Sequence, residues 1–517
     1  MERDEKTSVE MREAQSAEKV SPPAAAPAFD FASRDPDQLA EQKKKLLRKV
    51  DGRLLPLLIL MYLFNFLDRS NLAQARQGTL EADLGMTGTD FNLATSIFFI
   101  GYLLMQLPSN LIITRVRPSL YLAGVTVLWG VVSACNGATR KFTDLIVVRF
   151  FLGFVEAPFF PGVIFLMSSW YTRAELTRRV AWFYSGSALA NMFGGLLAAG
   201  ILGNMHNAQG IAGWRWLFII EGVVTVFIGL CAAYFLPDYP QNTRWLTEEE
   251  RALASYRLLE DIDEADEATA TSVWHGVKLA LKDYRLYLFV LLQHLSLLSQ
   301  TFQYFFPSIV GTLGYGSIVT LLLTVPGKWP VLLSPPGDTI LTPHKSHSVW
   351  FATFLTTIAA TFSASRTNDR SLHIIGLMLV ATVGNVIATA TSNLAARFFA
   401  MFLMPMGSVS AFVIIVPWIA NSFPRPLVKR SACVAIANMI GNTASAYGSY
   451  MYPASAAPQY VPGGSANAVI SLTVAILALV LRWLHQREND KLERAEVEAG
   501  SGNLAETQTK SGFRFIY

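Results

Sequence analysis

Charged residues are scarce in this sequence. Asp, Glu, Lys and Arg make up only 15% of its 517 residues, compared with about 25% in a typical soluble protein. Hydrophobic residues make up 52% of the chain, and the mean hydropathy is +0.35. This composition excludes an ordinary soluble domain. The formal net charge is only +4, so the sequence gives no reason to expect a nucleic-acid partner.

Cysteine is scarce as well, which bears on the chemistry to be expected. The three cysteines, Cys135, Cys231 and Cys433, lie far apart in apolar segments. Their spacing matches neither a metal site nor a redox motif, so we assign them to packing and expect no cofactor. The loops also lack a nucleophile elbow or a paired catalytic motif. We therefore do not expect an enzyme.

The sequence is rich in long apolar segments. A helix of roughly 18 or more apolar residues is long enough to cross a bilayer, and such windows recur along the chain. The twelve predicted spans lie near residues 54–75, 91–113, 119–138, 143–167, 180–203, 214–236, 285–307, 317–363, 374–391, 396–420, 430–450 and 467–485. The predicted fold is therefore an all-α membrane protein with twelve transmembrane helices.

Polar segments divide these spans into two sets of six. We predict a disordered cytoplasmic tail over residues 1–50, a first six-helix half over 51–236 and a cytoplasmic central loop over 237–284. A second half follows over 285–486, with a cytoplasmic tail over 487–517. The halves also echo each other, because WYTRAELTRR from Trp170 and WIANSFPRPLVKR from Trp418 each precede an ANMxG segment. Such internal repeats are typical of transporters.

Basic residues concentrate on alternate loops, which predicts the orientation in the membrane. The clusters are Lys43, Lys44, Lys45, Arg48 and Lys49; Arg115 and Arg117; Arg173, Arg178 and Arg179; and Arg425, Lys429 and Arg430. By the positive-inside rule both termini face the cytoplasm. No cleavable signal peptide is visible, so we expect the first span to direct insertion itself.

Four charged residues interrupt the apolar spans and form the candidate site. Asp68 and Arg69 lie in the first span, and Arg149 and Glu156 lie in the fourth. Each costs about 2.5 to 3.5 kcal/mol near the bilayer centre, so we expect them to face a cavity or one another. Arg149 and Glu156 lie about 10 Å apart along one helix face, and adjacent helix residues point about 100 degrees apart. Their partners must therefore come from another helix or from a ligand.

Two interpretations of these four residues remain open. If both spans line one cavity, Asp68 and Glu156 can bind protons while Arg69 and Arg149 bind an organic anion, because protonating both acids changes the net charge of the cluster from zero to +2. Proton and anion binding then favour each other reciprocally. Alternatively, the four residues form a permanent salt-bridge network that fixes helix packing.

Other polar residues in the spans carry weaker signals. On the seventh span, His294, Gln300, Gln303 and Tyr304 are candidates for binding the uncharged part of a substrate. His294 could instead be satisfied by a neighbouring helix, and the same alternative holds for Glu221 on the sixth span.

Several motifs together resemble one known family. They are DRSNL at 68–72, GYLLMQLPSNL at 101–111, RFFLGFVEAPFFPGV at 149–163, WRWLFIIEG at 214–222 and NSFPRPLVKR at 421–430. The chain resembles the major facilitator superfamily, and within it the anion:cation symporter family, with the fungal allantoate and nicotinate permeases most similar. This resemblance implies proton coupling through Asp68 and Glu156, with Arg69 and Arg149 contacting the substrate carboxylate or the coupling acids.

One segment departs from the resemblance. Residues 327–348, GKWPVLLSPPGDTILTPHKSHS, interrupt the eighth span with prolines and charges that cannot continue a helix through lipid. Gly327-Lys328 can be encoded by a splice-donor-like sequence, so we hypothesise a retained intron in the gene model. Sequencing of the transcript tests this hypothesis.

The sequence as a whole predicts a monomeric plasma-membrane transporter that imports a small organic anion, such as a vitamin or a ureido acid, together with protons. An efflux antiporter of the same fold is the first alternative, although the Gly-Pro-rich fifth-span motif expected of it is missing, since that span has no proline. A nutrient sensor without flux and a nonfunctional product of an incorrect gene model are the others.

Overall fold

The computed structural model describes residues 34–113, 116–263, 273–311, 349–423 and 427–499, together with Phe29, Phe31 and Phe515. Every regular element in these ranges is a helix. The helices of the first half are α2 (Pro36–Ala75), α3 (Leu80–Leu84), α4 (Asp90–Ile113), α5 (Pro118–Cys135), α6 (Phe142–Glu156), α7 (Phe159–Ser168), α8 (Arg173–Asn204) and α9 (Gly213–Phe235). The central loop contains α10 (Glu248–Asp263) and α11 (Val273–Lys282).

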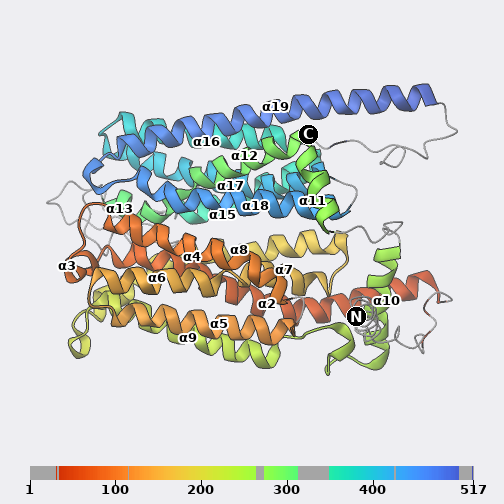
Figure 1. The fold of residues 1–517 in the computed structure, drawn as a ribbon, viewed down its shortest axis with the longest axis horizontal. Coiled ribbons are helices and arrows are strands. Elements are labelled where there is room, and N and C mark those ends of the chain that lie inside the picture. Colours follow the sequence, from red (N-terminus) through yellow and green to blue (C-terminus); the bar gives the residue numbers. More distant parts are fainter. Residues whose placement is uncertain are drawn as a thin grey trace, which may run out of the picture.

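The second half repeats this all-helical architecture. Its helices are α12 (Tyr284–Ser299), α13 (Phe306–Gly311), α15 (Val349–Thr367), α16 (Ser371–Ala390), α17 (Leu394–Ser422), α18 (Leu427–Gly448) and α19 (Val461–Ala499). Short 3-10 turns join them, including η1 (Asn136–Ala138), η4 (Thr301–Phe305) and η5 (Ser449–Met451). In Figure 1 the two halves lie side by side, with α3 and α13 at one end of the bundle and α10 and α11 at the other. We refer to these as the α3 end and the α10/α11 end.

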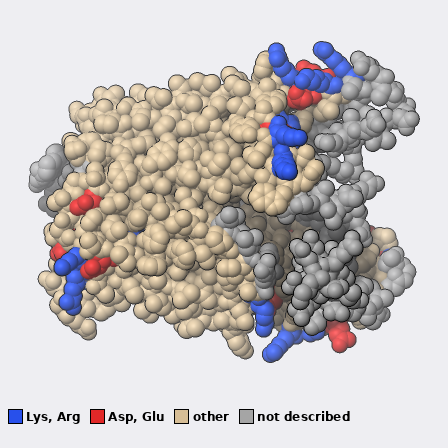
Figure 2. Space-filling model, viewed as in Figure 1, with Lys and Arg blue, Asp and Glu red and all other residues tan. Residues whose placement is uncertain are grey.

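The surface of the bundle matches a protein that spans a membrane. Each predicted span coincides with at least part of one helix or of two consecutive helices, and eight helical segments in the described residues are long and apolar enough to cross a bilayer. Large apolar side chains such as Phe227 and Leu230 point outward from α9. Figure 2 shows acidic and basic side chains toward the ends of the molecule, with a nearly uncharged surface between them. Such a surface is suited to lipid contact.

Three boundaries differ from the sequence-based expectations. The prediction of a disordered tail through residue 50 is wrong for residues 36–50, because α2 already begins at Pro36. The last span extends beyond its predicted end, since α19 continues to Ala499. The fourth span is two helices, because α6 ends at Glu156 and Pro158, which has no N–H to donate, caps α7. The anomalous segment 327–348 lies outside the described residues, as does most of the predicted tail.

Matching helix pairs in the two halves support the predicted repeat. Helix α5 packs against α9 in the first half, and α16 packs against α19 in the second. An ion pair joins the two helices of each pair. In the first half, Arg117 before α5 binds Asp238 after α9 at 2.6 Å. In the second half the positions of acid and base are reversed, since Asp369 before α16 binds Arg482 of α19 at 2.5 Å. Burial opposes ionisation of Asp238, but hydrogen bonds from Ser119 and Arg117 outweigh it and lower the pKa of this carboxyl. Asp238 therefore remains ionised at neutral pH.

The halves join each other at the α3 end. One buried apolar cluster there contains residues of both halves, with Phe91 of α4 packed edge-on against Phe305 of η4 at 5.4 Å. Asn92 donates to the Ser449 carbonyl at 2.5 Å, and the hydroxyls of Ser96 and Ser449 lie 2.6 Å apart. A second buried cluster, formed by α11, α12 and α15 to α19, contains no residue of the first half among those described. The packed contact between the halves thus closes the bundle at the α3 end.

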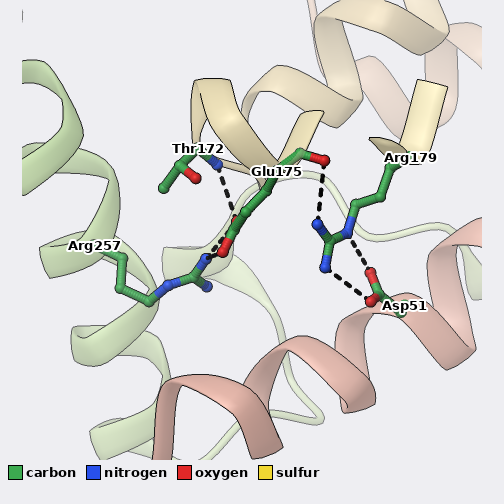
Figure 3. A network of polar contacts seen from close by, with 5 residues as sticks. All are labelled: Asp51, Thr172, Glu175, Arg179 and Arg257. Carbon is green, nitrogen blue, oxygen red and sulfur yellow. Dashed lines mark hydrogen bonds and ion pairs between the residues drawn. The ribbon is translucent and has the colours of Figure 1, made fainter. Parts of the chain in front are cut away.

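The two central helices dock on different halves. Helix α11 packs against α18 of the second half, whereas α10 contacts α2 of the first half. Figure 3 shows the polar network that holds α10: Arg257 donates to both carboxylate oxygens of Glu175, at 2.5 and 2.6 Å. Glu175 also accepts from the Thr172 backbone and thereby caps α8, while Arg179 on the same helix binds Asp51 of α2 with two hydrogen bonds. The central loop is thus anchored to the first half through the start of α8.

Replacing Arg257 by alanine is expected to release α10. The Arg257 side chain is only 5% exposed, and its loss leaves Glu175 without this cation. Breaking a largely buried pair costs about 3 to 5 kcal/mol, which should raise deuterium uptake in peptides of residues 248–263 by tenfold or more in rate. The matched control is Arg244→Ala, which removes an exposed arginine just before α10. Equal exchange in the two variants would contradict the docking role.

Candidate functional site

The candidate site lies where α2, α4 and α6 meet inside the first half. Arg69 of α2 donates through Nε to Glu156, the last residue of α6. The Glu156 side chain is fully buried, and that of Arg69 is 17% exposed. Glu156 therefore takes its partner from another helix, as the seven-residue spacing from Arg149 requires. The break between α6 and α7 immediately follows this acid.

Arg149 is buried beside this pair without a carboxylate of its own. Its Nε donates a long hydrogen bond of 3.4 Å to the Ala94 carbonyl. One terminal nitrogen has no hydrogen-bond partner among the described residues, and no ion pair of Arg149 occurs among them either. The residue is only 2% exposed. A buried cation in this condition is energetically costly unless an anion joins it.

One aromatic side chain, Phe98, lies close to both arginines. The guanidinium carbons of Arg69 and Arg149 lie 5.4 and 5.1 Å from the centre of the Phe98 ring. Arg69 also lies 5.0 Å from the ring of Tyr102, one turn further along α4. Ring faces attract cations, at about 0.5 to 2 kcal/mol per contact. Phe98 and Tyr102 thus help to hold two like charges close together, and sequence reasoning missed both.

Two glycines bring α4 and α6 close enough for this arrangement. A Cβ atom on Gly153 would lie 1.9 Å from the Phe98 carbonyl oxygen, and one on Gly101 would lie 2.2 Å from that of Phe150. Each glycine therefore allows one helix backbone to touch the other, as small residues do in membrane helix packing. Both glycines lie within motifs that were visible in the sequence, GYLLMQLPSNL and RFFLGFVEAPFFPGV, but the contact between their helices was not.

Asp68 occupies a separate environment on the other side of α2. Its carboxylate accepts hydrogen bonds from Ser133 at 2.6 Å and Trp129 at 3.0 Å on α5, and from Thr225 at 3.3 Å on α9. It forms no ion pair among the described residues. The expectation of one compact cluster of two acids and two arginines is therefore corrected: Arg69 pairs with Glu156, whereas Asp68 is held by neutral donors. The separation follows from the 100-degree rotation between helix neighbours.

The predicted residues of the seventh span are divided between two places. The ring of Tyr304 packs edge-on against Phe99 at 5.4 Å and lies within electrostatic range of Arg69, Glu156 and Arg149. Tyr304 therefore extends from the second half toward the charges of the first. Gln303 donates to the side chain of Gln300 at 3.3 Å, on the same short segment.

His294 lies apart from these residues. Its ring nitrogens contact the Ile440 carbonyl at 3.0 Å and the Tyr447 hydroxyl at 2.5 Å, both on α18. The structure thus places His294 in an interhelical contact between α12 and α18, the alternative left open by the sequence. Glu221 likewise accepts from Asn71 of α2 at 2.8 Å.

The chemistry available to this arrangement is binding and proton exchange. The described residues contain no group of His, Cys, Asp or Glu side chains able to hold a metal ion. They do place one unpaired buried guanidinium next to an arginine whose only ion-pair partner is a protonatable acid. Such a site can bind a proton on Glu156 and an anion on the arginines together, because neutralising Glu156 frees Arg69 for the anion.

Comparison with known proteins identifies the family. The profile described as Major Facilitator Superfamily matches residues 58–365. The chain is 32% identical over 473 residues to the MFS-type transporter cnsO of Penicillium expansum, covering 88% of this chain and 86% of the relative. It is 33% identical over 487 residues to the major facilitator-type transporter hxnP of Emericella nidulans, covering 89% and 90%. A candidate tartrate transporter of Agrobacterium vitis is 30% identical over 365 residues, covering 70% and 75%.

Solved structures agree with the fold. A bacterial homologue of the human lysosomal transporter Spinster, in an inward-facing unoccupied conformation, matches with a TM-score of 0.59 at 12% identity, covering 82% of this chain and 94% of that one. A D-xylose-proton symporter matches with a TM-score of 0.58 at 15% identity, covering 81% and 96%. Together with the twelve predicted spans and the sequence matches, these findings establish that the chain is a multi-pass membrane transporter belonging to the major facilitator superfamily.

Proposed function

We propose that this transporter imports a small organic anion together with protons, as a member of the anion:cation symporter family. We further propose that it works as a monomer in the plasma membrane, with both termini in the cytoplasm. The basic residues at the start of α2, which include Lys43 and Lys49, favour this orientation by the positive-inside rule. The α3 end would then face the outside of the cell.

The observation that carries this proposal is the state of Arg149. It is a buried guanidinium in the interior of a membrane protein, with one long hydrogen bond and no ion pair among the described residues. A planar guanidinium matches a carboxylate with two parallel hydrogen bonds. A carboxylate-bearing substrate would supply the missing partner. Tartrate, for which the relative from Agrobacterium vitis is named, is a substrate of this chemical class.

The Arg69–Glu156 pair supplies the coupling step. While Glu156 is ionised it occupies Arg69. Protonation makes Glu156 neutral and leaves Arg69 free to bind the same anion as Arg149, since both guanidinium groups lie close to the Phe98 ring. The proton thus favours the anion, and by linkage the anion favours the proton to the same extent. Tyr304 belongs to the second half and interacts electrostatically with these charges of the first half. In this proposal Tyr304 contacts the bound substrate and so links substrate binding to movement of the second half during alternating access.

An uptake screen combined with two variants tests the proposal. Yeast cells expressing the chain would be offered radiolabelled carboxylates, ureido acids, neutral sugars and cations. We expect saturable uptake of one carboxylate class, and loss of at least about 30-fold in Arg149→Ala and Arg149→Lys, because losing one member of a buried charge pair costs about 2 to 5 kcal/mol. Lysine fails because it lacks the planar fork.

The control variant is Arg140→Ala, which removes an exposed arginine before α6. It should leave uptake unchanged. Uptake of only neutral or cationic solutes would contradict the proposal, as would full activity in Arg149→Ala. Export without import would favour the efflux alternative, and surface expression without any flux would favour the nutrient sensor.

A further inference from the structure

A third buried acid, Glu221, lies outside the coupling scheme described above. It is on α9 and only 2% exposed. One carboxylate oxygen accepts from Asn71 of α2 at 2.8 Å, and the other has no hydrogen-bond partner among the described residues. Glu221 forms no ion pair within those residues. Its surroundings therefore provide one neutral donor for a whole carboxyl group.

Glu221 and Asp68 belong to one polar ladder between α2 and α9. Asp68 accepts from Thr225, and one turn along, Asn71 donates to Glu221. The two helices run in opposite directions, since α2 leads toward the α3 end and α9 starts there. Both hydrogen bonds between α2 and α9 therefore agree on the relative position of the two acids. Glu221 lies one helical turn, about 5 Å, nearer the α3 end than Asp68 does.

The elements packed against α9 add no cation to this ladder. They are α2, α5, α8 and η1, and the ionisable group among the described residues that acts on Glu221 is Asp68. Asp68, in turn, acts electrostatically on Glu221 on one side and is influenced by Glu156 on the other. The three carboxyl groups thus form a series, of which only Glu156 contacts an arginine.

The two acids of the ladder stabilise negative charge unequally. Three hydrogen bonds reach the Asp68 carboxyl, whereas one reaches Glu221. A buried carboxylate without a cation costs several kcal/mol, and hydrogen bonds to its oxygens offset part of that cost. In this conformation a single proton shared by the two acids is therefore better placed on Glu221, with the negative charge on Asp68.

We propose that Glu221 is a further proton-binding site, which receives protons from the α3 end and passes them to Asp68. In the transfer the O–H bond of the Glu221 carboxyl breaks and a new O–H bond forms on the Asp68 carboxylate, so that the negative charge moves to Glu221. A proton from the α3 end then protonates Glu221 again. This inference rests on the proposed proton coupling and adds an entry site to it. The simpler alternative is that Glu221 only ties α2 to α9 through Asn71.

Infrared difference spectroscopy separates these possibilities without any substrate. The purified full-length chain in lipid vesicles would be stepped between acidic and alkaline buffer, and the C=O stretching bands of protonated carboxyl groups recorded. We expect one buried-acid band to disappear in Glu221→Gln and a different one in Asp68→Asn. Glutamine retains an oxygen for the Asn71 hydrogen bond but binds no proton, so a purely structural role would leave the spectrum unchanged. Glu221→Asp should restore a titrating band.

The control is Glu248→Gln, which alters an exposed acid at the start of α10. It should leave both buried bands in place. A Glu221→Gln spectrum identical to that of the wild type, with the Asp68 band present, would overturn this inference alone. If the wild type shows no titrating buried carboxyl at all, the proton coupling proposed above is overturned together with it.

Discussion

Replacing Glu156 by glutamine is expected to abolish proton-driven accumulation while exchange of substrate across the membrane continues. Glutamine has almost the same shape as glutamate, so α6 and its crossing with α4 should be preserved. Its amide oxygen can still accept a hydrogen bond from Arg69, which is the ion-pair partner of Glu156 in the structure. The variant lacks the negative charge of Glu156, which a proton would otherwise neutralise. The binding of anion then no longer depends on a proton at this position.

Two assays in vesicles separate accumulation from exchange. With an imposed inward proton gradient, the wild type should concentrate the substrate found by the uptake screen. Glu156→Gln should only equilibrate it, to a ratio of about one, because anion binding no longer depends on a proton at residue 156. Counterflow of labelled against unlabelled substrate should persist in the variant. The matched control is Glu81→Gln, which changes a half-exposed glutamate paired with Arg76 at 2.7 Å. Uptake by Glu156→Gln that follows external pH as the wild type does would contradict the coupling role.

The transmembrane architecture was predictable because it follows from composition and length. Lipid contact requires apolar side chains along each span, so the twelve windows are visible in the sequence without knowledge of their neighbours. The internal repeat was also predictable, since α5 with α9 and α16 with α19 pack alike. Where helix boundaries in the structure differ from the predicted ones, the cause lies in the residues at that boundary. The amphiphilic segment from Pro36 continues α2 beyond the lipid, and Pro158 breaks the fourth span.

The pairing within the site was only partly predictable. Helix geometry excluded a bond between Arg149 and Glu156 and excluded mutual pairing of Asp68 with Arg69. It could not reveal which helix faces which, so the assignment of Arg69 to Glu156 and of Asp68 to Trp129 and Ser133 required coordinates. The same limit applies to His294, whose partner helix depends on the rotation of α12. Phe98 carried no signal, because one phenylalanine among many in apolar sequence is ordinarily a packing residue.

Adding a single methyl group at Gly153 is expected to disrupt the site more than most changes of its polar residues. In Gly153→Ala the new Cβ would lie 1.9 Å from the Phe98 carbonyl oxygen and 2.8 Å from its carbonyl carbon. Both are backbone atoms, so no side chain can rotate away. Helices α4 and α6 must separate, and such overpacking costs about 1 to 3 kcal/mol or more. The same separation moves Arg149 away from the Ala94 carbonyl and away from Phe98.

Gly124→Ala is the matched control for this prediction. Gly124 is also a helical glycine in a membrane span, on α5, but a Cβ atom there has no neighbour within 4 Å. Alanine should be neutral or stabilising at that position, by up to about 1 kcal/mol from helix propensity. Thermal unfolding in detergent should therefore separate the two variants, with a lower transition temperature for Gly153→Ala. Substrate uptake per folded molecule should fall by about 100-fold in Gly153→Ala, because displacement of a binding group by about 1 Å has effects of this size. A Gly153→Ala protein with wild-type stability and uptake would show that the backbone contact between α4 and α6 does not position the arginines.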